Sequence, residues 1–233
     1  MQPPTVEVLI LRADVPTDVL ESLQKLLDDI DLRRAYEYRR PEDRRRYIVA
    51  HAALRSRLAP VVGDSPQALR FSIGPHGKPA GPPAGRCFSI SHSGAYVALA
   101  FSAAPVGVDV QEHRAIADRI RLAETCFSPP ELARLRESGG AESIFFEVWT
   151  AKEAVVKGDG RGIAAGLQNF AVPASASLPR GVVDLGCDPP LSTWRVARFD
   201  VAPGYSGAVA AIGDGWTPHV RHASVAEILA GLS

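Results

Sequence analysis

The 233-residue sequence predicts an α+β fold made of two similar halves, and two observations carry this prediction. Segments with helical spacing of apolar residues interleave with short segments of strand-like alternation. The stretch SGAYVALAFS in the first half is also echoed by YSGAVAAIG in the second, which predicts that each half ends in a strand of small residues. Such an arrangement favours a ligand site between the halves. The length by itself fits one large domain or two smaller ones.

The first half begins with a predicted strand over residues 6–12, VEVLILR. Residues 16–31 are predicted to form one helix, because four apolar side chains fall on a common face. A second helix is predicted before Pro60, where Tyr47, His51, Leu54 and Leu58 keep helical spacing. Alternating residues over 96–101 predict another strand.

In the second half, Ser128 followed by two prolines and Glu131 predicts an N-cap with a capping box, and the helix should end at Gly139. A longer helix is expected over residues 142–157, before the glycines of GDGRG. The segments WRVARF and GAVAAI predict two strands near the end of the chain.

Composition narrows the class of protein. Apolar residues make up 46% and charged residues 22% of the chain, as in ordinary globular proteins. Since 26 basic residues balance 26 acidic ones, nothing global indicates nucleic acid or a membrane as partner. The three cysteines are widely spaced and form no CxxC pair, which argues against a disulfide scaffold or a zinc site. With no secretory signal evident, we expect a cytoplasmic protein.

The stretch VGVDVQEHR, residues 106–114, places Asp109 inside an apolar run that reads as a buried strand. A buried carboxylate needs a partner or a metal ion. Because strand side chains alternate, Asp109 and Gln111 should share one face and Glu112 the other. Two oxygen-bearing side chains on one face could hold a hard cation such as Mg²⁺. The alternative is an ordinary strand end with an aspartate in a turn.

Other motifs each leave two interpretations open. Trp149, Glu153 and Lys157 make one helical stripe, either an exposed ion pair beside the core or, together with Lys152, a group suited to phosphates and a metal. The segment SISHSG, residues 89–94, is either a serine-rich turn or a set of donors to phosphate. Residues 33–46 hold seven arginines, either a solvated face or a clamp for a phosphate-bearing ligand.

Taken in order, four motifs resemble the surfactin-type 4′-phosphopantetheinyl transferases. They are GKP (77–79), SISHSG (89–94), GVDV (107–110) and WTAKEAVVKGDGRGI (149–163), followed by a strand carrying GAVAA. The spacing of WxxKEAxxK about forty residues after GVD is the most specific part. The resemblance implies a monomer of two subdomains related by a pseudo-two-fold axis, each a small mainly antiparallel sheet with packed helices. We place the boundary between residues 1–105 and 106–233.

The resemblance also implies a reaction: transfer of the phosphopantetheine arm of coenzyme A to a serine of an apo carrier protein, releasing adenosine 3′,5′-bisphosphate. It implies that Asp109 and Glu153 bind Mg²⁺, or Mn²⁺ in its place. Glu153 would also accept the serine proton, and Lys157 would stabilise the leaving group. His92 and Ser91 would hold coenzyme phosphates.

The remaining implied contacts are Lys78 on the adenine side and Arg46 and Arg34 near the 3′-phosphate. The sequence departs from the family pattern at Gln111, where an acidic third metal ligand is common; an amide can still bind Mg²⁺ or one of its waters. The carrier could belong to fatty-acid, polyketide or nonribosomal peptide synthesis. The alternative function is a non-catalytic protein that binds coenzyme A or an adenine nucleotide.

Overall fold

The computed structural model describes residues 4–74, 79–80, 86–162, 166–174 and 177–230. The helices are α1 (Thr17–Gln24), α2 (Asp29–Glu37), α3 (Pro41–Val62), α4 (Arg119–Cys126), α5 (Pro129–Glu137), α6 (Glu142–Asp159) and α7 (Val225–Ala230), with 3-10 turns η1 (Pro66–Ala68) and η3 (Leu167–Asn169). The strands are β1 (Thr5–Arg12), β2 (Ser72–Ile73), β3 (Pro79–Ala80), β4 (Cys87–Ser93), β5 (Tyr96–Ser102), β6 (Val106–Glu112), β7 (Phe170–Ala171), β8 (Arg180–Gly181), β9 (Val183–Asp184), β10 (Trp194–Phe199), β11 (Tyr205–Ile212) and β12 (Thr217–His222).

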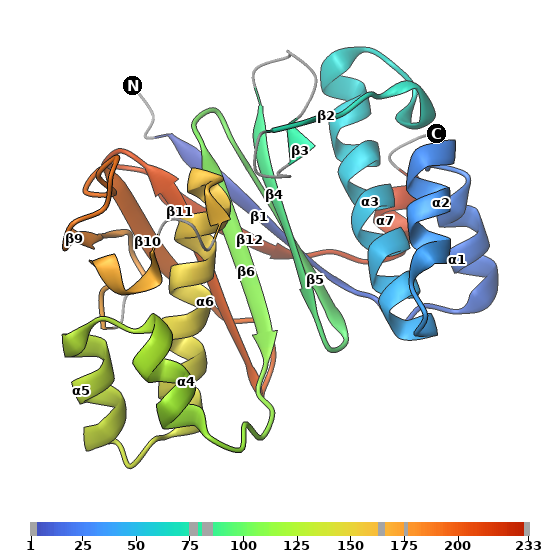
Figure 1. The fold of residues 1–233 in the computed structure, drawn as a ribbon. Coiled ribbons are helices and arrows are strands. Elements are labelled where there is room, and N and C mark those ends of the chain that lie inside the picture. Colours follow the sequence, from blue (N-terminus) through green and yellow to red (C-terminus); the bar gives the residue numbers. More distant parts are fainter. Residues whose placement is uncertain (1–3, 75–78, 81–85, 163–165, 175–176, 231–233) are drawn as a thin grey trace.

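Two four-stranded sheets form the centre of the molecule, in the orders β12-β1-β5-β4 and β6-β11-β10-β8. Their edge strands β4 and β6 lie next to each other, so the two halves meet along this line (Figure 1). The two segments that echo each other in the sequence, in β5 and β11, are each the second strand from this seam. The predicted α+β fold of two mainly antiparallel halves is confirmed.

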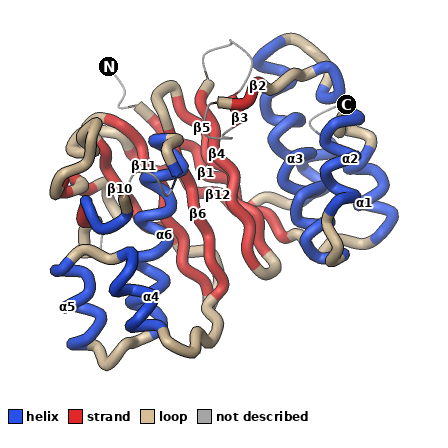
Figure 2. Tube along the Cα trace, viewed as in Figure 1, coloured by secondary structure: helices blue, strands red, loops and turns tan. Residues whose placement is uncertain are grey.

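The layers follow from the alternation of side chains along each strand. Helices α1, α2, α3 and α7 cover one sheet and α4 to α6 cover the other, with the strands between them (Figure 2). A third apolar core, with Val8 of β1, Val108 of β6 and Val209 of β11, joins the facing sides of the two sheets. Each central strand therefore buries both of its faces, which explains the continuous apolar runs in the sequence.

The end of the chain returns to the first half. Strand β12 pairs with β1 in parallel, and α7 packs its Val225 and Ile228 into the core of the first half. The Ser56 hydroxyl of α3 also donates to the Ile228 carbonyl at 2.9 Å. The boundary between residues 105 and 106 stays a prediction, and the sheet order adds that residues 217–230 lie spatially with the first half.

The prediction of one helix over residues 16–31 is wrong, because the helix is interrupted. Helix α1 ends at Gln24, and α2 begins after Asp28, whose carboxylate accepts hydrogen bonds from the Ile30 and Asp31 amides. An aspartate that caps a helix in this way favours a new helix start over continuation.

Other local predictions are confirmed. The capping-box glutamate accepts from the Ser128 amide at 2.7 Å, and helix α5 follows it directly. Helix α6 forms as predicted but continues through Gly158 to Asp159, two residues beyond the expected end, and Gly160 caps it in the left-handed conformation at φ 89°. The serine-rich segment before Gly94 is strand β4 and not a turn, and the chain reverses at Gly94 itself, with φ 54°.

Candidate active site at the seam between the two sheets

The carboxylate of Asp109 lies at the centre of the seam, and its side chain is 0% exposed. Its Oδ1 accepts from Lys157 Nζ of α6 at 2.6 Å and from the Ser91 hydroxyl of β4 at 2.7 Å. Its Oδ2 is buried and has no hydrogen-bond partner. A buried acceptor left in this state is costly, so this oxygen suits a cation that the protein does not itself supply.

Helix α6 reaches Asp109 because Gly107 lets it approach the strand. A Cβ atom on Gly107 would lie 1.9 Å from the Ala154 carbonyl oxygen and 2.3 Å from the Gly158 amide nitrogen. Only a glycine therefore permits this spacing between β6 and α6. Because side chains alternate, residues 107, 109 and 111 face α6, and the predicted common face of Asp109 and Gln111 is confirmed.

Glu153 lies one helical turn before Lys157 on α6 and is partly buried. Burial, and next the charge of Asp109, raise the pKa of Glu153, while Lys157 opposes this shift. Two carboxylates that repel each other, one on β6 with an unpartnered oxygen and one on α6, fit a hard divalent cation between them. Among the described residues, no group of three or more His, Cys, Asp or Glu side chains is arranged to hold a metal ion, so the remaining ligands would be amide oxygens, water or substrate.

Cationic groups lie on the first-half side of the seam. His92 of β4 shares its strand face with Phe88 and Ile90, which pack toward α3. Burial, and then the charges of Arg46, Lys157 and His51, lower the pKa of His92. Arg46 is held in place by Asp43 and by the Gly94 carbonyl at 2.7 Å. A neutral imidazole among cations is suited to donate a hydrogen bond to an anion.

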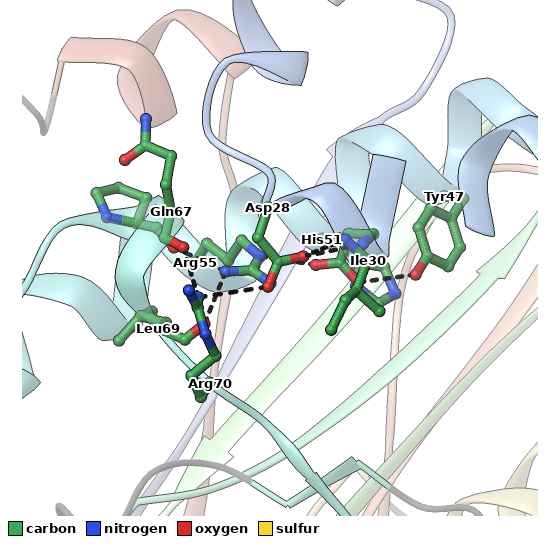
Figure 3. Close-up of polar contacts among 10 residues, drawn as sticks. Asp28, Ile30, Tyr47, His51, Arg55, Gln67, Leu69 and Arg70 are labelled. Carbon is green, nitrogen blue, oxygen red and sulfur yellow. Dashed lines mark hydrogen bonds and ion pairs between the residues drawn. The ribbon is translucent and has the colours of Figure 1, made fainter. Parts of the chain in front are cut away.

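A buried polar network orders α2 and α3 behind these cations (Figure 3). Arg55 is 1% exposed and contacts Asp31 and Asp28, each at 2.7 Å. Asp31 also accepts from the Tyr47 hydroxyl at 2.9 Å and lies 3.3 Å from His51 Nδ1. Although burial by itself would raise the pKa of Asp31, His51 and Arg55 lower it overall. The network therefore fixes the direction in which His51 faces.

Arg34 lines a cavity of about 110 Å³ beside this network, together with His51, Arg70 and Phe71. Asp28 and Asp31 line the cavity too, and both are paired with Arg55. The other basic groups and the aromatic ring suit a phosphate next to a planar base. Lys78 lies outside the described residues.

Lys152 does not join the site, although it precedes Glu153 directly. Its side chain is 1% exposed and contacts Glu131 at 2.8 Å and the Leu167 and Phe170 carbonyls at 2.7 and 2.6 Å. Neighbouring residues on a helix point about 100° apart, which turns Lys152 into the core of the second half. The interpretation of Lys152 as a phosphate or metal group is not supported.

Gln111 and Glu112 separate as the strand alternation predicts. The Gln111 Oε1 accepts from the Ser93 hydroxyl at 3.3 Å, on the side of Asp109. Glu112 accepts from the Tyr205 hydroxyl at 2.8 Å and lies beside Gly94. Glu112 therefore does not replace the missing third acid.

The structure brings together Asp109, Glu153, Lys157, Ser91, His92 and Arg46, and it places Arg34 in the adjoining cavity. Sequence reasoning missed His51, which was counted only as part of an apolar helix face. A histidine four residues after Tyr47 and four before Arg55 was the available signal, since the three share one face of α3. The role of Gly107 was missed as well.

Comparisons with known proteins identify the family of this chain. A family model described as the 4′-phosphopantetheinyl transferase superfamily matches residues 105–212. HetI of Nostoc sp., named a 4′-phosphopantetheinyl transferase, is 31% identical over 90% of this chain and 88% of its own length. The chain belongs to the 4′-phosphopantetheinyl transferase superfamily.

Two further relatives place it within the superfamily. The protein slr0495 of Synechocystis sp. is 36% identical over 68% of this chain and 67% of its own length. Sfp of Bacillus subtilis, also named a 4′-phosphopantetheinyl transferase, is 28% identical over 81% of this chain and 83% of its own length. The predicted surfactin-type phosphopantetheinyl transferase, and its nature as an enzyme, are confirmed. Within the described residues, no helix is both long and apolar enough to cross a membrane.

Proposed function

We propose that this phosphopantetheinyl transferase moves the 4′-phosphopantetheine arm of coenzyme A to a serine hydroxyl of an apo acyl or peptidyl carrier protein. The observation that carries the proposal is the seam itself. A buried carboxylate with an unpartnered oxygen faces a second carboxylate there, beside a group of cations. Carboxylates that could hold a metal ion and cationic side chains that could bind phosphates therefore lie close together, as transfer at phosphorus requires.

Asp109 and Glu153 are the residues that we propose to hold Mg²⁺, with Gln111 contributing its amide oxygen or a bound water. The orphaned Oδ2 of Asp109 supports this, as does the raised pKa of Glu153. When bound, the ion would neutralise negative charge on the coenzyme pyrophosphate.

Glu153 is the proposed general base. The serine oxygen of the carrier forms a new bond to the phosphorus that carries pantetheine, and the bond from this phosphorus to the bridging oxygen breaks. Glu153 takes the hydroxyl proton. Its raised pKa suits this role, because a base accepts a proton best when its pKa lies nearer to the pH of the reaction. Lys157 stabilises the charge that develops on the departing adenosine 3′,5′-bisphosphate.

The cations of the first half are proposed to bind the coenzyme. His92 and Arg46, next to Lys157, are suited to the phosphates near the seam. Arg34, in the cavity with His51 and Arg70, is suited to the 3′-phosphate. The proposed adenine contact of Lys78 concerns a residue outside the described part of the chain.

The test is a carrier-modification assay with coenzyme A, Mg²⁺ and apo carriers of the fatty-acid, polyketide and nonribosomal peptide types. We expect at least one carrier to gain the mass of the phosphopantetheine arm, and Glu153→Gln to prevent this gain. If no carrier gains mass with the wild-type protein, while coenzyme A binding is retained in Glu153→Gln, the chain is a coenzyme binder and the proposed function is wrong.

A further inference from the structure

Three serine hydroxyls of β4 bridge the seam between the two sheets. β4 and β6 are edge strands of different sheets, and among the described residues they share no backbone ladder. Outward-facing amides of β6 donate to serine Oγ atoms instead: Val108 to Ser89 at 3.1 Å, Val110 to Ser91 at 3.2 Å, and Glu112 to Ser93 at 3.0 Å. We call these three serines the serine ladder. Each contact spans 19 positions, so the two strands run parallel and in register.

Two members of the serine ladder also hydrogen-bond to a side chain on the β6 face that carries Asp109 and Gln111. The Ser91 hydroxyl donates to Asp109 Oδ1 at 2.7 Å, and the Ser93 hydroxyl donates to Gln111 Oε1 at 3.3 Å. Asp109 and Gln111 each lie 18 positions after the serine that contacts them. The residue 18 positions after Ser89 is Gly107, which has no side chain. Ser89 therefore bridges only to the backbone, whereas Ser91 bridges to both the backbone and the carboxylate.

The hydrogen-bonding capacity of Ser91 is fully used by these contacts. A hydroxyl group has one proton to donate and two lone pairs that accept. The proton goes to Asp109, and the lone pairs accept from the Val110 amide at 3.2 Å and from Lys157 Nζ at 3.0 Å. Ser91 is also buried, at 5% exposure, and its single proton is already donated to Asp109, so none remains for a coenzyme phosphate.

The geometry points to Ser91 as a positioning residue that fixes the Asp109 carboxylate, and not as a phosphate-binding residue. With Oδ1 held from two sides, the carboxylate cannot rotate, and Oδ2 is presented as the free oxygen. Ser93 orients Gln111 in the same manner from the next position. Serines of the first half of the chain thus set the orientation of the proposed metal ligands in the second half. This inference rests on the proposed metal role of Asp109.

The test is a titration of the full-length protein with Mn²⁺, without coenzyme or carrier, in which unbound Mn²⁺ is measured by electron paramagnetic resonance. We expect Ser91→Ala to weaken Mn²⁺ binding by about 10-fold or more, as the loss of a group that orients a ligand does. Ser91→Thr keeps the hydroxyl and should restore binding. Ser89→Ala is the matched control, because it removes the same backbone bridge and should leave Mn²⁺ affinity unchanged.

A second readout separates positioning from phosphate binding. In the carrier assay, Ser91→Ala should raise the Mg²⁺ concentration needed for half-maximal rate and leave the KM for coenzyme A unchanged. A raised KM with unchanged Mn²⁺ affinity would overturn the inference, as would equal losses of Mn²⁺ affinity in Ser89→Ala and Ser91→Ala. If Ser91→Ala does not fold, Ser91→Cys is the substitute, because it keeps the shape of the side chain but donates only a weak hydrogen bond. Unchanged Mn²⁺ affinity in Ser91→Cys would overturn the inference equally.

The titration also keeps the two proposals apart. A wild-type protein that binds Mn²⁺ but modifies no carrier refutes the proposed function alone, since the effect of Ser91→Ala on Mn²⁺ is still measured. A wild-type protein that binds no Mn²⁺ overturns the positioning role.

Discussion

Replacing Gly107 by alanine tests whether the spacing between β6 and α6 sets the geometry of the site. The added Cβ would lie 1.9 Å from the Ala154 carbonyl oxygen, whereas ordinary contacts begin at 3.4 Å. The atoms it meets belong to the helix backbone, which cannot turn aside as a flexible side chain does. On its other side, α6 is closed in by the Trp194 ring, which a Cβ on Gly158 would meet at 2.4 Å.

The expected effect follows from this lack of room. Helix and strand must separate by more than about 1 Å, and overpacking of this kind costs about 3 kcal/mol of the free energy of unfolding. For a chain of this size the melting temperature should fall by about 6 to 12 °C. The same shift moves Lys157 Nζ away from Asp109, now at 2.6 Å, and a displacement of about 1 Å in a site can lower the rate about 100-fold.

Both quantities are measurable, with Gly181→Ala as the control. Urea unfolding gives the free energy, and the carrier assay gives kcat for the folded fraction. At Gly181 the nearest atom to an added Cβ is Arg195 Nη1 at 3.5 Å, so this change fits and should alter neither quantity. If Gly107→Ala keeps the stability and kcat of the wild type, contact at this glycine does not set the spacing of the site.

Four further predictions concern the charged groups. Lys152→Met leaves the Glu131 carboxylate buried without its charge partner and should cost about 3 to 5 kcal/mol in urea unfolding, with the KM for coenzyme A unchanged; a raised KM at full stability would instead indicate phosphate binding. Gln111→Glu adds charge on the face of Asp109 and should lower the Mg²⁺ concentration for half-maximal rate; an increase would show that this side chain does not face the ion. Asp109→Ala should abolish carrier modification, and substantial turnover would place the metal elsewhere. The pKa of Glu153 is raised and a base acts only when deprotonated, so the rate should fall as the pH drops through that pKa. Asp109→Asn removes the neighbouring charge and should move this fall, measured on the residual activity, to lower pH. An unchanged pH profile in that variant would contradict the assignment of Glu153 as the base.

Motif spacing left two interpretations open for Asp109, Glu153 and Lys157, and the resemblance to a known family named them as site residues. Strand alternation identifies the face of Asp109, and helical spacing places Glu153 and Lys157 on one side of α6. The same local reasoning separated Gln111 from Glu112. It could not show that Lys152 turns into the core, since both sides of α6 carry residues compatible with a site, and only packing against Glu131 and Phe170 decides between them.

Apolar periodicity also hid the break before α2. Residues 16–31 keep one apolar face through the interruption, while the helix restarts at Asp28 because its carboxylate caps the next turn. The pairing of β12 with β1 was equally hidden, because it joins residues more than two hundred positions apart and nothing in either segment specifies the partner.

The sequence by itself determined the α+β class, elements such as β5 and α6, and the candidate chemical groups of the site, because these follow from periodicities and motifs within a few residues. Only the tertiary structure decided how the groups face one another. The 19-position contacts from β4 to β6 join two sheets, and the approach of α6 depends on a glycine that local patterns leave unmarked. Such contacts form when whole elements pack, so the orientation of Asp109 is a property of both halves together.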